Sequence, residues 1–293
     1  MNGPLGFPGS SPNAALEVQL NRGFLPPGHI CLTLANDGTD ATNDIAIAPG
    51  ACRSTVAIVN GTPSTLMKDQ GDLEIPASIV KQLDVSWAPA MFGGGGLSGL
   101  RCPGSSISDT TWHIYVVGAP GRQCDVLAVD SATQATVLAE LRKIGFTAYR
   151  RIGSVLRESS ALVAFKQTGN YFLRKTHAAV DLNNPGTSAV THTLKVPVGI
   201  VVEAEVYFGV SLGGAVNATY GWLSPLDAVD ETPSANITNI CVTDDSAGGV
   251  GVSRSPLRVY TNTSGQVRSR LNGSSTDITV NLHVRGWTDT RDA

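Results

Sequence analysis

The chain has 293 residues and a formal net charge of −3 at pH 7; 15% of its residues are charged and 6% aromatic, while glycine (32) and proline (16) are plentiful. This length can bury one large core or two ordinary ones, and the lack of a basic excess argues against nucleic acid as a partner. No apolar run reaches the roughly 18 residues of a membrane span, so we expect no membrane insertion.

The first segment, residues 1–28, contains several glycines and prolines and few long apolar side chains. Such a composition cannot bury a core of its own. The segment also lacks the basic and apolar regions of a secretory signal. We therefore predict an extended attachment arm that becomes ordered on a partner or on a neighbouring subunit.

Residues 29–182 contain short runs typical of strands, such as "ICLTLAN", "DIAIAPG" and "TTWHIYVV". One short helix is expected at 131–144, where Ser131 is a suitable N-cap and Gly145 fits the position after the helix. Residues 168–170 (Thr-Gly-Asn) are a hairpin turn signal. The segment is predicted to be a β-rich domain with this single helix.

Residues 183–293 begin with the loop cluster "NNPGTS" and then consist almost entirely of strands and turns. Their spacing is typical of an antiparallel β-sandwich. We expect "TNTSGQVRSRL" to form a hairpin with its turn at Ser264 and Gly265. The predicted fold class is therefore mainly β: an N-terminal extended arm, a β-rich domain with one short helix, and a C-terminal antiparallel β-sandwich.

An acid-rich stretch at 36–44, "NDGTDATND", resembles a calcium loop at first sight. An EF-hand loop starting at Asn36 would need a ligand at its third position, glycine at its sixth and a bidentate glutamate at its twelfth. The chain has Gly38, Ala41 and Ile47 there. Since Asp and Asn side chains also bond nearby backbone amides in turns, we interpret the stretch as a turn, with a cation site of another type as the alternative.

The five cysteines contain no CxxC pair, which argues against a zinc site of the usual spacing. We expect mainly reduced, buried thiols, although an odd number also leaves room for a disulfide between subunits. Cys31 and Cys52 bracket the acid-rich turn and are the candidate disulfide partners. No cofactor and no metal site is expected.

Two patterns could indicate catalysis. Residues 209–213 match the G-x-S-x-G nucleophile elbow, followed by Asp227 or Asp230 and then by His283. The elbow needs a strand-to-helix turn in a parallel sheet, and no helix follows here, so we interpret 209–213 as a turn between strands. Glu203 and Glu205 share one face of a strand, where a glycosidase could place its two catalytic acids. Because acids on the solvent-facing side of a strand are far commoner, we interpret the two glutamates as surface residues.

The remaining polar candidates are histidines and arginines within predicted strands. His113 and His192 have no second ligand at metal-binding spacing, so they are interpreted as ordinary strand residues. The basic residues of the middle segment are interpreted as solvated strand edges, with binding to an acidic surface glycan or to a neighbouring subunit as the alternative. They are Arg150, Arg151, Arg157, Lys166, Arg174 and Lys175.

Several segments together resemble a family of bacteriophage structural proteins, the tail-fibre or virion-appendage proteins. They include "LTLANDGTDATNDIAIAPGACRS" (32–54), "GFTAYRRIGSVLRESSALVAFKQTGNYFLRK" (145–175), "NPGTSAVTHTLKVPVGI" (184–200) and "RVYTNTSGQVRSRL" (258–271). The resemblance covers the chain from about residue 30 to its end. It implies a non-enzymatic virion component, made in the host cytoplasm, that forms homotrimers and attaches through its N-terminal end. The five cysteines and the length of the predicted helix depart from the family pattern.

The leading hypothesis is therefore a structural phage protein, a tail fibre or a collar- or baseplate-type appendage. It would bind itself, other virion proteins through residues 1–28, and a glycan or protein of the host surface. The alternatives are a tail-associated glycan-degrading enzyme and a carbohydrate-binding module. The module would need exposed aromatic residues, whereas the four tryptophans are expected to pack in the core.

Overall fold

The computed structural model describes residues 31–53, 58–59, 62–63, 72–88, 98–119, 123–130, 145–146, 148–213, 219–234, 241–243 and 251–290. Every regular element among them is a strand, which confirms the prediction of a mainly β fold. The expected arm at 1–28 and the expected helix at 131–144 lie outside these residues. Within the described part of the chain, no helix is present that could cross a membrane.

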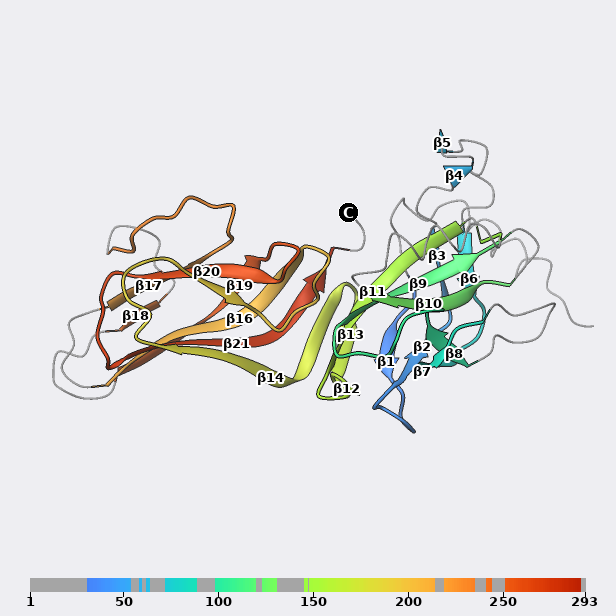
Figure 1. Cartoon of the computed structure of the whole chain (residues 1–293), viewed down its shortest axis with the longest axis horizontal. Coiled ribbons are helices and arrows are strands. Elements are labelled where there is room, and N and C mark those ends of the chain that lie inside the picture. Colours follow the sequence, from blue (N-terminus) through green and yellow to red (C-terminus); the bar gives the residue numbers. More distant parts are fainter. Residues whose placement is uncertain are drawn as a thin grey trace, which may run out of the picture.

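The N-terminal half is built on an eight-stranded mixed sheet in the order β1-β2-β7-β8-β10-β9-β11-β12 (Figure 1). All neighbours are antiparallel except β8, which is parallel to both β7 and β10. Its strands are β1 (Leu34–Asn36), β2 (Asp44–Ile47), β7 (Ile79–Ser86), β8 (Gly99–Arg101), β9 (Thr111–Gly118), β10 (Asp125–Asp130), β11 (Ala148–Glu158) and β12 (Ala161–Leu162). Two small ribbons accompany it, β3 (Gly50–Arg53) with β6 (Asp72–Ile75), and β4 (Ile58–Val59) with β5 (Thr62–Pro63).

Side-chain hydrogen bonds connect edge strand β1 of the eight-stranded sheet to residues 163–167. The Asn36 side chain at edge strand β1 accepts a hydrogen bond from the Phe165 N–H (2.9 Å) and donates one to the Val163 carbonyl (3.3 Å). The Gln167 side chain accepts a bond from the Leu34 N–H (2.6 Å). Residues 163–167 follow edge strand β12 directly, so these bonds satisfy backbone groups that an open sheet would leave unpaired.

The C-terminal half contains two antiparallel sheets that face each other across an apolar core, as in a β-sandwich. The five-stranded sheet comprises β13 (Phe165–Thr168), β14 (Tyr171–Asn183), β21 (Ile278–Asp289), β16 (Val202–Leu212) and β19 (Gly251–Tyr260), in that order. The four-stranded sheet comprises β15 (Val190–Thr193), β20 (Gln266–Leu271), β17 (Thr219–Ser224) and β18 (Cys241–Thr243), in that order. We refer to β1–β12 as the N-terminal lobe and to β13–β21 as the C-terminal lobe.

Two turn predictions have different outcomes. Strands β13 and β14 form the expected hairpin, with Thr168 opposite Tyr171 and Gly169 at a φ of +59°. The predicted hairpin at Ser264 and Gly265 is wrong: the local turn exists, but β19 pairs with β16 and β20 pairs with β15 and β17. The chain crosses there from one sheet to the other, because each strand pairs where its apolar side chains face the core.

The hairpin β13–β14 also bears on the domain division at residue 183. β14 runs to Asn183 and pairs with β21, so the strands at 165–183 belong to the five-stranded sheet. The division into 1–28, 29–182 and 183–293 stays a prediction. The two lobes share one apolar core. Phe172 of β14 lies within that core and stacks on Trp287 at 5.6 Å between ring centroids. A Cβ placed on Gly153 of β11 would lie 2.8 Å from both Phe172 and Leu34.

Candidate functional site

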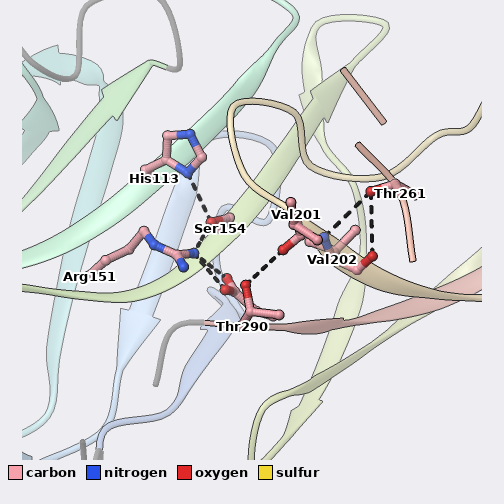
Figure 2. A network of polar contacts seen from close by, with 8 residues as sticks. His113, Arg151, Ser154, Val201, Val202, Thr261 and Thr290 are labelled. Atoms are coloured by element: carbon pink, nitrogen blue, oxygen red, sulfur yellow. Dashed lines mark hydrogen bonds and ion pairs between the residues drawn. The ribbon is translucent and has the colours of Figure 1, made fainter. Parts of the chain in front are cut away.

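The two lobes meet at a buried ion pair. Arg151 lies on β11 just before a bulge, and Asp289 is the last residue of β21. One guanidinium nitrogen, Nη1, lies 2.6 Å from Asp289 Oδ1 and 2.8 Å from Oδ2 (Figure 2). Asp289 has no exposed surface and Arg151 very little. A pair buried to this degree depends on both members, because either one alone would be an uncompensated charge.

His113 extends this network on the N-terminal side. The Arg151 guanidinium donates to Ser154 Oγ at 2.9 Å, and Ser154 Oγ lies 2.9 Å from His113 Nδ1 (Figure 2). The direction of the bond between Ser154 Oγ and His113 Nδ1 follows the tautomer of the imidazole. Burial, followed by the positive charge of Arg151, lowers the pKa of His113 from 6.5 to about 4, and Asp130 offsets only part of this shift.

Further polar contacts surround the ion pair. The Val198 N–H donates to Thr111 Oγ1 across the lobes at 2.9 Å. The Thr290 hydroxyl donates to the Val201 carbonyl at 2.7 Å (Figure 2). Arg174 bonds both Glu158 (2.9 Å) and the Lys195 carbonyl (3.1 Å). We call the set of Arg151, Asp289, His113, Ser154, Thr111, Val198, Arg174 and Glu158 the lobe junction.

The interpretation of the basic residues as solvated strand edges is wrong for the arginines. Arg150, Arg157 and Arg174 are buried, and Arg151 is nearly so. Arg157 Nη1 lies 2.6 Å from Asp109 Oδ1 and Nη2 donates to the Ser160 carbonyl. Alternation along a strand indicates on which face each side chain lies, but it does not show that another segment covers that face.

A second polar cluster lies on the outer face of the five-stranded sheet. Glu203 and Glu205 of β16 share this face, as expected from their spacing. Glu203 lies 3.8 Å from Arg258 of β19, and Glu205 lies 3.6 Å from Arg285 of β21. Arg285 also donates to the Tyr207 hydroxyl at 3.0 Å and lies over the Tyr207 ring.

Tyrosines complete this outer face. A Cβ on Gly286 would lie 2.8 Å from the Tyr171 hydroxyl, so Tyr171 lies across the sheet at that glycine. Burial and then a hydrogen bond to Glu205 raise the pKa of Tyr171 above its usual value. Tyr260, at the end of β19 and opposite Glu203, is 54% exposed. The outer face thus combines cross-strand ion pairs with an exposed aromatic ring.

The hydrolase-like pattern at 209–213 has no catalytic geometry. Gly209, Ser211 and Leu212 lie inside antiparallel strand β16, so the interpretation as a turn was also wrong. The Ser211 hydroxyl donates to Asn281 Oδ1 at 2.7 Å. His283 lies opposite Tyr207 and 3.6 Å from Asp181 of β14. The second candidate pair, Glu203 and Glu205, lies beside arginines on neighbouring strands.

The acid-rich stretch forms the predicted turn. Asp37 Oδ2 accepts the N–H groups of Thr39 (2.7 Å) and Asp40 (3.0 Å), and Asp40 Oδ1 accepts that of Thr42 (3.0 Å). The Asp40 and Thr39 N–H groups hold the pKa of Asp37 below its usual value. Across the described residues, no group of three His, Cys, Asp or Glu side chains is arranged to hold a metal ion.

Cys31 and Cys52 lie on neighbouring segments. The Cys31 N–H donates to the Ala51 carbonyl at 3.0 Å, directly beside Cys52 in β3. Both are thiols in the structure, with Cys31 exposed and Cys52 buried. A disulfide between them stays a prediction, as does their oxidation state outside the cell.

The histidines and tryptophans lie largely as predicted. His113 and His192 are buried strand residues of β9 and β15, and His192 Nε2 lies 2.7 Å from Ser269 Oγ. Trp87, Trp112 and Trp287 are in the core, and Trp222 is half-buried. The aromatic residue exposed on the outer sheet face is a tyrosine, which the sequence analysis did not single out.

No protein-family model matches the chain, and no curated protein matches it. Among solved structures, the chain is similar to a chain in the structure of infectious bursal disease virus, Gt strain. That similarity has 10% sequence identity and a TM-score of 0.14, and it covers 87% of this chain and 68% of the viral chain. At this TM-score the likeness carries no argument about fold or function.

Proposed function

We propose that the chain is a non-enzymatic structural component of a bacteriophage virion, a tail fibre or a collar- or baseplate-type appendage. The observation that carries the proposal is the lobe junction. A buried ion pair and a shared apolar core hold two β-rich lobes in one orientation, as a rigid adaptor between other proteins requires. The resemblance of segments throughout the chain to phage appendage proteins supports the same role.

In this role, residues 1–28 attach the protein to the particle by folding against another virion protein. Homotrimers would present three copies of each surface, which multiplies a weak affinity for the host without any new contact. The outer face of the five-stranded sheet, with its tyrosines and arginines, is the candidate surface for such a contact.

The oligomeric state gives a direct test. We expect light scattering coupled to size-exclusion chromatography to give three chain masses for the full-length protein. The same measurement on a chain that lacks residues 1–28 separates self-association from attachment, because the arm is proposed to bind other virion proteins. A stable monomer would contradict the trimer, and particles that contain none of the protein by antibody labelling would contradict the virion role.

A carbohydrate-binding role is the second candidate, favoured by the exposed ring of Tyr260 beside Arg258 and Glu203. Aromatic faces stack on sugar rings, and planar charged groups bond sugar hydroxyls. If this role is correct, a glycan array should show binding that Tyr260→Ala removes and Val229→Ala, at another exposed apolar residue, leaves intact. Release of shorter glycans during the assay would instead favour the glycan-degrading enzyme.

A further inference from the structure

A lysine and an aspartate lie in contact inside the N-terminal lobe. Lys81 is on β7, in register with Ile45 of β2, and Asp125 is the first residue of β10. Lys81 Nζ lies 2.6 Å from Asp125 Oδ1, and only 3% and 7% of the two side chains are exposed. The intervening strand β8 has only three residues, and Lys81 Nζ also lies 3.4 Å from the Gly99 carbonyl at its start.

Two N–H groups fix the orientation of the Asp125 carboxylate. The Trp87 indole N–H donates to Oδ2 at 2.8 Å, and the Val126 backbone N–H donates to Oδ1 at 2.7 Å. Trp87 is itself held in an apolar cluster, where it packs edge-on against Phe146. An amine is thus directed at a carboxyl group whose oxygens are already held by donors, in a site from which water is largely excluded. Such preorganised donors stabilise negative charge that develops on a carboxyl oxygen during amine attack.

We propose that Lys81 and Asp125 are the site of an intramolecular isopeptide bond between β7 and β10. A proton passes from Nζ to Oδ1 across the 2.6 Å contact, which leaves a neutral amine beside a carboxylic acid. The nitrogen lone pair then attacks Cγ, a C–N bond forms, and the electron pair of the C=O bond moves to Oδ2, facing the indole N–H. A second proton passes from the nitrogen to Oδ1.

The Cγ–Oδ1 bond then breaks and one water molecule leaves. Oδ2 becomes the amide carbonyl oxygen and still accepts the Trp87 N–H, while one hydrogen remains on the nitrogen. Atoms and charges balance without an oxidant, a metal or a cofactor. The bond would replace a buried ion pair, whose desolvation opposes folding, by a neutral amide. It would also close a loop in the unfolded chain. The inference does not depend on the proposed virion function.

The intact mass of the denatured, full-length protein tests the proposal. We expect it to be lower than the mass of the sequence by one water molecule. Because trypsin cannot cleave after an acylated lysine, a digest should lack cleavage at Lys81 and contain one branched peptide that joins the Lys81 and Asp125 segments. A full sequence mass with normal cleavage after Lys81 would overturn the proposal.

Two variants sharpen this experiment. Lys81→Arg keeps a positive charge beside Asp125 but cannot form the amide, so it should have the full sequence mass. Asp37→Glu controls for water loss by succinimide formation at the exposed Asp37–Gly38 bond and should keep the wild-type mass deficit. A deficit that disappears in Asp37→Glu and persists in Lys81→Arg would overturn the proposal. The wild-type mass decides the question even if Lys81→Arg does not fold.

Discussion

The two lobes place their charged residues differently. The N-terminal lobe has the Lys81–Asp125 pair inside the protein, and Arg157 is buried against Asp109. The C-terminal lobe encloses an apolar sandwich core, and its ion pairs are more exposed, such as Glu203 with Arg258, which is 65% exposed. A buried pair fails when one partner is removed, whereas an exposed pair loses little because water solvates what remains. Charge changes should therefore destabilise the N-terminal lobe and the lobe junction more than the sandwich surface.

The architecture explains this difference. In the eight-stranded sheet, the side chains of Asn36 and Gln167 bond edge strand β1 to the segment 163–167, and the short strand β8 leaves room for Lys81 to reach Asp125. The sandwich instead satisfies its backbone through long, continuous ladders such as β16 with β21. The lobe that lacks regular pairing at some positions uses polar side chains there, since buried backbone and charged groups need partners.

Removal of the Asp289 charge should have the largest effect. Asp289→Asn leaves Arg151 buried opposite a neutral amide, so we expect the free energy of unfolding to fall by about 3–5 kcal/mol. Urea unfolding followed by tryptophan fluorescence measures the change. The matched control is Asp230→Asn, at a carboxylate that is 36% exposed; it removes ion pairs with the half-buried Arg268 and Arg270 and should lower stability by less than Asp289→Asn does. Equal losses in the two variants would contradict the contrast between buried and exposed pairs.

The pH dependence should follow His113. Its folded pKa is about 4 and its unfolded value 6.5, so the unfolded chain binds a proton first as the pH falls. Stability is fully present above pH 6.5 and is lost between 6.5 and about 4, by about 3 kcal/mol in total. The change in the free energy of unfolding between pH 7 and pH 4, measured from unfolding curves, should therefore be smaller in His113→Gln than in wild type.

His192 in the C-terminal lobe serves as the comparison for this titration. Burial lowers the pKa of His192 too, so it contributes in the same direction. It lies beside the neutral hydroxyl of Ser269, whereas His113 also faces the charge of Arg151. We therefore expect His192→Gln to reduce the pH dependence less than His113→Gln does, and the reverse order would contradict this comparison.

The contact between the lobes can be tested at Gly153. A Cβ at this position would lie 2.8 Å from both Leu34 and Phe172, so Gly153→Ala should destabilise the protein by about 1–3 kcal/mol. Gly38, in the exposed acid-rich turn, has nothing within 4 Å of such a Cβ. Gly38→Ala should therefore change the unfolding midpoint little. Similar effects at both glycines would argue against close packing between β11 and β14.

The smallest effect is expected on the outer sheet face. Glu203→Gln removes an ion pair of 3.8 Å with the exposed Arg258, and the free energy of unfolding should fall by less than about 1 kcal/mol. Because salt screens exposed charges, the difference from wild type should vanish in about 1 M salt. A loss that persists at high salt would mean that this face is more buried in solution than in the isolated chain.

Much of the local structure could be predicted from the sequence. Runs of residues typical of strands identified strands such as β2 and β9, and the Asx-type bonding of Asp37 and Asp40 fits the expected turn. The spacing of Glu203 and Glu205 correctly placed both on one face. These features depend on neighbouring residues, so a local pattern suffices. The buried ion pairs could not be found in this way, because Arg151 and Asp289 are separated by 138 positions.

Local sequence patterns suffice to predict that the protein is built from strands and where many of its turns lie. Which strands pair depends on contacts between distant segments and is seen only in the folded protein. Pairing separates β19 and β20 into different sheets although a turn connects them, and it places 209–212 inside a strand. Tertiary contacts also decide which charges are buried, so that Arg151 and Lys81 lie opposite carboxylates instead of water. The physical reason is that pairing and burial depend on segments distant in the chain, whereas strand and turn preferences are properties of adjacent residues.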